Sequence, residues 1–198
     1  MNSLEIDKRL FIAIMPDKKT RDYLRDAIRV LTKYSRNLRF VNVEQLHMTL
    51  QFLGNNVTDE SLEQIISRLK SIDTNGITIQ MADLHFGFKG QTHPSVLFWE
   101  VEDNDKLKQL TKEVHTYVQE LKLEDIKKQK DHSKLIHHIT LARTKRTFSH
   151  NEVKKLMEKF NKDFTQEPPA FSPAEFVIMQ SVFNKNGNVY KIIETFPL

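Results

Sequence analysis

Two short segments of the chain place a histidine and a threonine two positions apart. They are Leu46-His47-Met48-Thr49-Leu50 and His137-His138-Ile139-Thr140-Leu141, and both contain the pattern His-x-Thr-Leu. Each lies in a run rich in apolar and β-branched residues, which is typical of a strand. Side chains alternate between the two faces of a strand. Each segment is therefore predicted to project one imidazole and one hydroxyl from the same face.

The spacing of the two copies indicates a duplicated unit. His138 follows His47 by 91 positions, and each copy comes after a helical segment in a comparable β-α pattern. A duplicated unit suggests approximate twofold symmetry, which would bring the two strands together across a cleft. Two imidazoles and two hydroxyls would then converge on one site.

This set of side chains suits in-line attack at phosphorus. A neutral histidine can remove a proton from water and a protonated one can donate to the departing oxygen, because the ordinary pKa of about 6.5 makes both forms accessible near neutrality. The hydroxyls of Thr49 and Thr140 can donate to the non-bridging phosphate oxygens. A strained cyclic phosphate fits best, since its leaving group needs no metal for activation. We expect no metal and no cofactor.

The other histidines lack this pattern. A single strand histidine is more often a packing residue than a catalyst, but two copies of His-x-Thr-Leu reverse that expectation for His47 and His138. His137 stays open because it adjoins His138, although its side chain should face the opposite side of the strand. We assign the remaining five to the surface or to supporting positions: His85, His93, His115, His132 and His150.

Composition places the chain among soluble globular proteins. Of its 198 residues 39% are hydrophobic and 28% charged, and no apolar run approaches the roughly 20 residues of a membrane span. The N-terminus lacks the order of a signal peptide, so we expect a cytoplasmic monomer away from membranes. The absence of cysteine excludes disulfides, thiolate nucleophiles and cysteine-ligated zinc.

Charge favours an anionic partner. The net charge is +4, and basic clusters at Lys127 to Lys134 and Arg143 to Arg146 flank the second motif. Charge alone is a weak indication of nucleic-acid binding. The interval Leu123 to Leu135 has one isolated isoleucine and no apolar period, which predicts an exposed, mobile loop. It is either a solvated connection or a cover for a bound phosphate ester.

Periodicity predicts an alternation of helices and strands over residues 1–198 without a dividing linker. Apolar residues recur at helical spacing in four stretches: Leu24/Ala27/Ile28/Leu31, Leu62/Ile65/Ile66/Leu69, Leu107/Leu110/Val114/Val118 and Val153/Leu156/Met157/Phe160. Strands are predicted at Leu10–Met15, Leu38–Val43, Leu46–Leu53, Ile77–Phe88, Val96–Val101, Ile136–Ala142, Phe176–Phe183 and Val189–Ile193. This order predicts an α/β (α+β) fold with helices packed on mixed or antiparallel sheets.

With these features the chain resembles the 2H phosphoesterases, and within them the bacterial and archaeal RNA 2′,3′-cyclic phosphodiesterases, historically called 2′-5′ RNA ligases. The similarity spans nearly the whole sequence. Its blocks are Arg9 to Ile14 with Pro16, His47 to Gly54, Pro94 to Trp99, His138 to Arg143, and Ser181 to Tyr190, with Asn186-Gly187 as a hairpin turn. One departure is His137, where the family often has proline.

The resemblance implies one domain of two pseudo-symmetric lobes, with two mostly antiparallel sheets around a central cleft and helices outside. It implies hydrolysis of RNA 2′,3′-cyclic phosphate to a 2′-phosphomonoester, with reversible 2′-5′ ligation. By resemblance His138 is the proton acceptor and His47 the proton donor. It also favours substrate binding by Arg143, although alternation brings Arg143 to the cleft only if the strand ends or bends near Ala142.

Other functions stay open at this stage. A related phosphodiesterase could act on a small cyclic nucleotide, an ADP-ribose cyclic phosphate or 2′-5′ oligoadenylate. A non-catalytic RNA-binding module would explain the basic charge but not two intact motifs, because backbone binding uses Lys, Arg and aromatic residues. A histidine metalloenzyme would need a carboxylate that neither motif contains.

Overall fold

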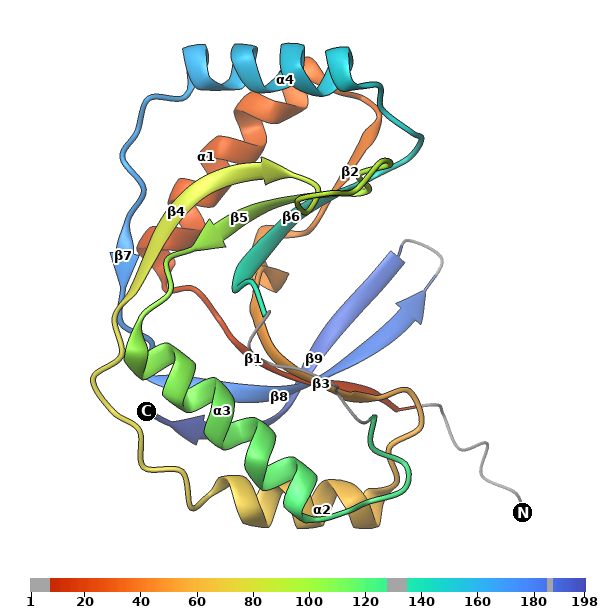
Figure 1. The fold of residues 1–198 in the computed structure, drawn as a ribbon, viewed down its shortest axis with the longest axis vertical. Helices are drawn as coiled ribbons and strands as arrows, with labels where there is room; N and C mark the ends of the chain where they lie inside the picture. Colours follow the sequence, from red (N-terminus) through yellow and green to blue (C-terminus); the bar gives the residue numbers. More distant parts are fainter. Residues whose placement is uncertain (1–7, 128–134, 185–186) are drawn as a thin grey trace.

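The computed structural model describes residues 8–127, 135–184 and 187–198 (Figure 1). Within them it contains four α-helices and nine strands. In chain order these are β1 Arg9–Ile14, α1 Lys18–Tyr34, β2 Leu38–Phe40, the 3-10 turn η1 Val43–Gln45, β3 Met48–Gly54, α2 Asp59–Leu69, β4 Ile79–Phe86, β5 Val96–Val101, α3 Asp105–Glu120, β6 His138–Thr144, α4 His150–Asp163, β7 Ala170–Phe171, β8 Glu175–Asn184 and β9 Gly187–Pro197. The predicted α+β class, the four helices and the eight strands are confirmed.

The strands form one strongly curled antiparallel sheet. Its order is β7-β4-β5-β6-β3-β1-β8-β9, and β2 pairs with β6 outside this path. The two expected sheets are therefore the two halves of a continuous sheet, joined where β3 meets β6 at the pair Met48 and Ile139. The two-residue strand β7 was not predicted, because two residues are too few to show a period.

Each half of the sheet is covered by two helices on its outer side. In Figure 1, α1 and α4 cover the half that contains β4, β5 and β6, and α2 and α3 cover the half that contains β1, β3 and β8. Tyr23 of α1 contacts Trp99 of β5 with ring centroids 5.1 Å apart. The helix after β1 thus packs on β5, and the helix after β5 packs on β3. This exchange of α1 and α3 ties the two halves together.

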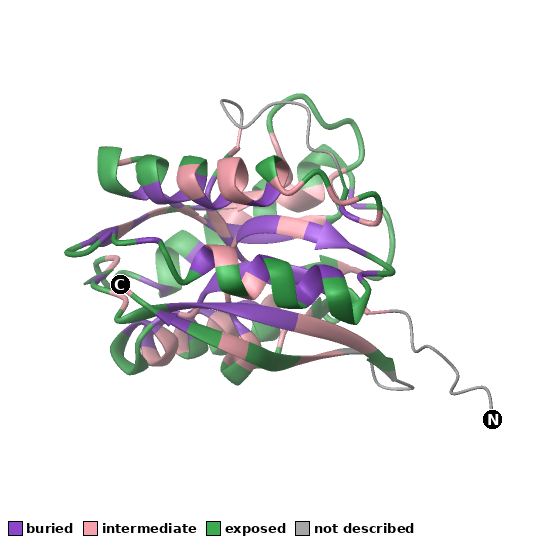
Figure 2. Cartoon of the chain, turned by 90° about the horizontal axis from the view of Figure 1, so that it is seen from below, coloured by how far each residue is buried: buried purple, intermediate pink, exposed green. Residues whose placement is uncertain are grey.

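The sequence determines where the helices begin and which side they bury. Each starts after a side chain that accepts a hydrogen bond from the first turn, namely Asp17, Thr58, Asn104 and Ser149. Ser149 and Glu152 form the predicted capping box. The apolar stripe of each helix faces the sheet, so that buried residues lie inside and exposed ones outside (Figure 2). None of the described helices is long and apolar enough to span a membrane.

The first part of the predicted mobile loop is folded against the body. Ile126 is only 6% exposed, and Asp125 accepts hydrogen bonds from the Thr58 backbone N–H (2.8 Å) and the Ser61 hydroxyl (2.7 Å). A Cβ on Gly54 would lie 2.9 Å from the Asp125 carbonyl oxygen, so glycine there permits the close approach. The expectation of an exposed loop is wrong for Ile126, because an isolated isoleucine gave no period, whereas Glu124 and Lys127 are exposed as predicted. Residues 128–134 and Asn186 of the predicted turn lie outside the described residues.

Candidate active site

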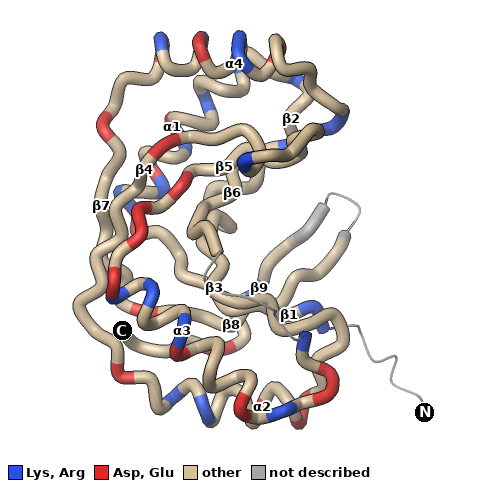
Figure 3. The backbone as a smooth tube through the Cα atoms, viewed as in Figure 1, with Lys and Arg blue, Asp and Glu red and all other residues tan. Residues whose placement is uncertain are grey.

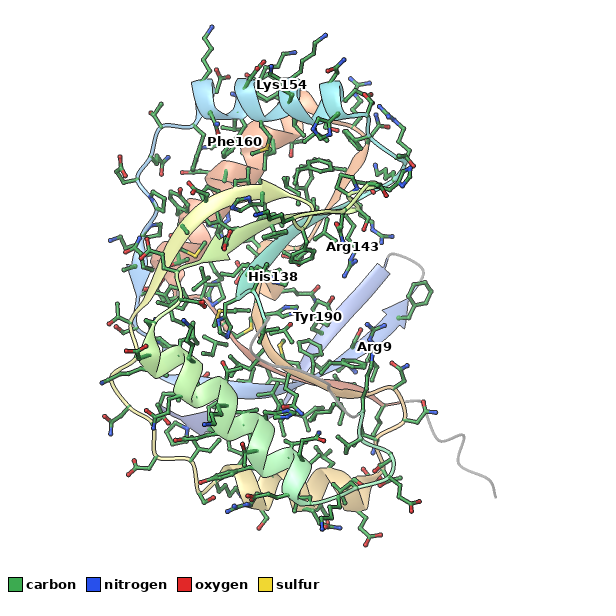
Figure 4. The ribbon with its side chains drawn as sticks, in the orientation of Figure 1. Arg9, His138, Arg143, Lys154, Phe160 and Tyr190 are labelled. Carbon is green, nitrogen blue, oxygen red and sulfur yellow. The ribbon has the colours of Figure 1, made fainter. Side chains whose placement is uncertain are left out.

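A cavity of about 390 Å³ opens between the two halves of the sheet. Its wall is formed by Arg9, Phe11, Val41, His47, Thr49, Phe52, Lys127, Thr140, Arg143, Ser181 and Tyr190. Figure 4 shows Arg143 projecting from one half and Arg9 and Tyr190 from the other. Four of the five predicted site residues therefore line one cavity, and the fifth, His138, lies two residues before Thr140 on β6.

The junction of β3 and β6 explains why the two motifs meet. Met48 and Ile139 are register partners, and both side chains are fully buried on the core face. Their neighbours in each strand point the other way. An antiparallel register through this pair sets His47 opposite Thr140 and Thr49 opposite His138. The pseudo-twofold relation passes through this single pair, and each histidine lies beside the threonine of the other motif.

The two histidines are held in the same way. Nδ1 of His47 donates a hydrogen bond to the Gln45 carbonyl oxygen at 2.8 Å, and Nδ1 of His138 donates to the Ile136 carbonyl oxygen at 2.8 Å. In both cases the acceptor is the backbone two residues earlier. A carbonyl oxygen can only accept, so these bonds place the proton of each neutral ring on Nδ1. Nε2 is left as the nitrogen that can take or give a proton.

Aromatic side chains hold each imidazole from two sides. The His47 ring lies 4.8 Å from Phe11 and 4.9 Å from Tyr190, between centroids. The His138 ring lies 4.9 Å from Phe98 and 5.1 Å from Phe88. Phe11 and Phe98 come from equivalent neighbouring strands, β1 and β5. Packing therefore fixes both rings in place and partly removes them from water.

This environment shifts both histidines toward the neutral form. Burial lowers the pKa of His47, and the charge of His138 lowers it further, against the hydrogen bond to the Gln45 carbonyl. Burial also lowers the pKa of His138, as does Arg143, whereas the Ile136 carbonyl and the Glu100 carboxylate act in the opposite direction. The effect of the His138 charge on His47 is consistent with the convergence of the two motifs at the β3–β6 junction. A bound phosphate anion would favour the protonated form of either ring.

A bulge in β6 brings Arg143 to the cavity. Leu97 pairs with Ala142 and Phe98 pairs with Thr140, so Leu141 is an extra residue without a partner in β5. Leu141 and Ala142 are both buried, and the alternation resumes with Arg143 on the cavity face. The strand thus departs from regular alternation near Ala142, which is the condition under which we expected Arg143 to reach the cavity. The sequence does not reveal the bulge, because Leu-Ala is compatible with regular pairing.

The first motif contains the same bulge. Ile12 pairs with Gln51 and Ala13 pairs with Thr49, so Leu50 is the extra residue. The alternation then resumes with Phe52, which lines the cavity five positions after His47, as Arg143 does five positions after His138. The duplication therefore extends through the bulge, and the two halves differ in what stands beyond it. Sequence reasoning missed Phe52, although counting from the repeated motif would have found it.

Three basic side chains surround the cavity, and only Arg143 was predicted individually. The Arg9 guanidinium lies 5.2 Å and the Lys127 ammonium 5.5 Å from the centre of the Phe52 ring. Figure 3 shows basic residues near the start of β1 in one half of the sheet and near the β2–β6 pair in the other half. The cavity is suited to an anion. Arg9 and Phe11 are two positions apart in β1 and so share a face, and this alternation could have predicted that both line the cavity.

His137 packs into the protein core beside the site. Its ring is 3% exposed, with Nε2 3.0 Å from the Thr111 hydroxyl and Nδ1 3.4 Å from an Asp103 carboxylate oxygen. Because the Thr111 hydroxyl donates to the Leu107 carbonyl oxygen, it accepts from His137 Nε2. His137 thus faces away from His138, as alternation predicted, and attaches the start of β6 to α3.

The other described histidines lie away from the cavity wall. His85 pairs with Glu100 at 2.7 Å and stacks on Phe98 behind His138. His93 and His150 are exposed and His115 is half-buried, whereas His132 lies outside the described residues. In the described part of the chain, His, Asp and Glu side chains form no group of three that could hold a metal ion.

Comparison with known proteins identifies the class that this fold and site define. A family described as the AKAP7 2′5′ RNA ligase-like domain matches residues 17–198. The chain belongs to this family of 2H phosphoesterases, which includes the LigT-like RNA 2′,3′-cyclic phosphodiesterases. The predicted family is confirmed.

Two bacterial relatives are similar over most of their length. The RNA 2′,3′-cyclic phosphodiesterase of Thermotoga maritima is 27% identical over 189 residues, 93% of this chain and 92% of the relative. The enzyme of the same name from Aquifex aeolicus is 26% identical over 165 residues, 81% of each chain. These identities support a distant relationship to RNA 2′,3′-cyclic phosphodiesterases.

Solved structures share the fold. The crystal structure of TT0787 from Thermus thermophilus has a TM-score of 0.72 at 24% identity and covers 96% of this chain and 97% of its own. E. coli LigT complexed with phosphate has a TM-score of 0.68, and with 3′-AMP 0.69, each at 20% identity over 97% of this chain and 98% of LigT. At these identities the likeness establishes the fold alone.

Proposed function

We propose that the protein hydrolyses 2′,3′-cyclic phosphate at RNA ends to a 2′-phosphomonoester with its own side chains and no metal. The observation that carries this proposal is the pairing of two His-x-Thr motifs across the Met48–Ile139 junction, with both imidazoles held alike through Nδ1. One site thus offers two proton-transfer groups and two hydroxyl donors. The names of the distant relatives and the phosphate and 3′-AMP bound to LigT support the same substrate chemistry.

The proposed reaction uses the two imidazoles in the roles that the family resemblance implies, His138 as proton acceptor and His47 as proton donor. His138 Nε2 takes a proton from water as the water oxygen bonds to phosphorus, and the bond from phosphorus to the 3′ oxygen breaks on the opposite side. His47 Nε2 gives its proton to that departing oxygen. The product carries a 2′-phosphate and a 3′-hydroxyl. The same ring opening, with a 5′-hydroxyl in place of water as the nucleophile, would give the 2′-5′ linkage of the proposed ligation.

The threonines and basic residues act on the phosphate. The hydroxyls of Thr49 and Thr140 donate to the non-bridging oxygens, whose charge grows in the transition state. Arg143 adds a positive charge from the edge of the cavity. Because burial favours neutral imidazoles, His138 is prepared to accept a proton. The phosphate charge raises the pKa of His47 and helps it to keep the proton that it donates.

Parallel assays on four substrate types test this function. The substrates are RNA ended by 2′,3′-cyclic phosphate, a 2′,3′-cyclic mononucleotide, an ADP-ribose cyclic phosphate and a 2′-5′-linked oligoadenylate, each with and without a chelator. We expect the highest kcat/KM for the RNA, a 2′-phosphate product and no effect of the chelator. A higher kcat/KM for one of the other three substrates would show that this compound, and not RNA, is the preferred substrate. RNA binding without turnover would indicate a binding module.

A further inference from the structure

The hairpin of β8 and β9 carries an exposed aromatic side chain beyond the cavity. Phe183 is 82% exposed, more than the other exposed large hydrophobic residues of the described chain, which are Ile136, Ile192 and Ile193. Toward the hairpin tip β8 changes from buried through intermediate to exposed residues (Figure 2). Single exposed apolar residues are common on protein surfaces. What distinguishes Phe183 is its position on β8 beside the cavity.

Phe183 lies on the face of β8 that lines the cavity. Val177 and Met179 on this face are buried under Phe11, and Ser181 belongs to the cavity wall. Residues two apart share a face, so Phe183 is the next position outward. At about 3.4 Å per residue, its Cα lies roughly 7 Å beyond that of Ser181. The ring therefore extends the cavity wall toward solvent.

The positively charged side chain of Arg9 comes from β1, the strand next to β8. Arg9 is the register partner of Ser181 and also lines the cavity. A guanidinium on β1 and an exposed ring further along the adjacent strand β8 match the two chemical features of single-stranded RNA, a charged backbone and flat bases. Proteins bind single strands by this combination of cations along the backbone and aromatic platforms for the bases.

We propose that Phe183 stacks on the base of the nucleotide that precedes the cyclic phosphate-bearing nucleotide, with Arg9 near the phosphodiester between the two. This inference rests on the proposed function and names its substrate as a single-stranded oligonucleotide rather than a mononucleotide. The terminal phosphate occupies the cavity between the threonines. The preceding nucleotide leaves along β8 and meets the Phe183 ring.

Steady-state kinetics of Phe183→Ala test the inference with two substrates that differ by one nucleotide. For a dinucleotide ended by cyclic phosphate we expect KM to rise roughly 5- to 150-fold, the range for loss of one stacked base. For the cyclic mononucleotide we expect no change, because the chemistry remains intact. Phe183→Trp should restore a low KM for the dinucleotide. Phe183→Leu should not, since leucine keeps the apolar surface but offers no flat ring.

Val182→Ala is the matched control, because Val182 is the adjacent residue and points to the opposite face of β8. It should leave both KM values within about twofold, well below the effect of losing a stacked base. An unchanged dinucleotide KM in Phe183→Ala, with active wild type, would overturn the stacking role and leave the proposed function intact. So would equal wild-type KM values for the two substrates.

Absence of all turnover in the wild type would instead overturn the proposed function. Equilibrium binding of a 2′-phosphorylated dinucleotide to wild type and Phe183→Ala then decides the stacking role. Weaker binding by the variant supports it, and equal binding overturns it.

Discussion

The two halves of the site share a backbone and differ in the side chains that surround it. Each half presents a histidine held by the carbonyl two residues earlier, a threonine two residues later, and then a bulge. Beyond the bulge one half has Phe52 and the other Arg143. The neighbours of the two imidazoles also differ. His47 packs against the Tyr190 ring, and His138 lies near the Glu100 carboxylate, which acts to raise its pKa.

We infer from this difference how a duplicated unit could support the proposed asymmetric reaction. The shared backbone supplies two proton-transfer groups at equivalent positions, which a symmetric phosphate could meet in either orientation. Arg143 and Phe52 break that equivalence, because a cation and a flat ring favour different parts of a nucleotide. We infer that the shared features serve the chemistry, and that the differing residues set which histidine meets water and which meets the leaving oxygen.

The largest effects are expected from the shared histidines. His47→Ala and His138→Ala should each lower kcat by a factor of about 10² to 10⁴, the range for a positioned acid or base. The double variant should be scarcely worse than the poorer single variant, since members of one catalytic unit are not additive. His150→Ala, at an exposed histidine, is the control for the substitution itself. Near-normal turnover by either variant would show that the substituted histidine is not the acid or base of the reaction.

The threonines should give the next largest effects, and similar ones in the two halves. Loss of a hydrogen bond to a charged acceptor costs about 1.5–3 kcal/mol, roughly 10- to 150-fold in kcat/KM. We therefore expect Thr49→Val and Thr140→Val to be impaired to this extent, because valine keeps the shape and removes the hydroxyl. Thr→Ser should be much milder. If serine were harmful and valine mild, the methyl group and packing would be responsible.

Arg143 and Phe52 should differ in their response to salt. Arg143 is exposed, so we expect Arg143→Ala to change the RNA KM by only about 1 kcal/mol, roughly fivefold. If Arg143 contacts a backbone phosphate, its loss should flatten the logarithmic salt dependence of KM by roughly 0.7. Phe52→Ala should leave that slope unchanged. Equal slopes for both variants and the wild type would exclude a phosphate contact by Arg143.

Asp125 should have the smallest effect on turnover. Its hydrogen bonds hold residues 123–127 against the body and so keep Lys127 at the cavity wall. Asp125→Ala should lower the free energy of unfolding by about 1.5–3 kcal/mol, because it removes a charged acceptor of hydrogen bonds from Thr58 and Ser61. The neighbouring exposed Glu124→Ala is the matched control. Burial opposes ionisation of Asp125, but its hydrogen bonds to Thr58 and Ser61 lower the pKa below the ordinary value.

The pH dependence of this stabilisation has a definite sign. A carboxylate with a lowered pKa in the folded state stabilises the protein above its unfolded pKa, near 3.9, and loses that effect as the pH falls through the folded pKa. The stability difference between wild type and Asp125→Ala should therefore shrink in acid. Chemical denaturation at several pH values measures it, and a constant difference would show that ionisation of Asp125 is not involved.

The sequence was sufficient for the elements and for the paired motifs. Alternation correctly placed His137 on the side opposite His138, and helical periodicity located all four helices. It could not show Arg143 in the cavity, because the bulge at Leu141 depends on pairing with β5. Nor could it show that Ile126 is buried, since that depends on contacts with distant parts of the chain. Local patterns predicted local structure, and the missed features arise from tertiary pairing.

The most direct measurement of the central claim is the dependence of kcat/KM on pH for wild type, His47→Ala and His138→Ala. Two histidines acting as acid and base predict a bell-shaped wild-type profile, displaced to the acidic side because burial lowers both pKa values. The two apparent pKa values belong to the coupled pair. Loss of the base should abolish the rise with pH, and loss of the acid should abolish the fall. With the proposed roles, His138→Ala loses the acidic limb and His47→Ala the alkaline limb. Retention of the full bell in both variants would contradict the account.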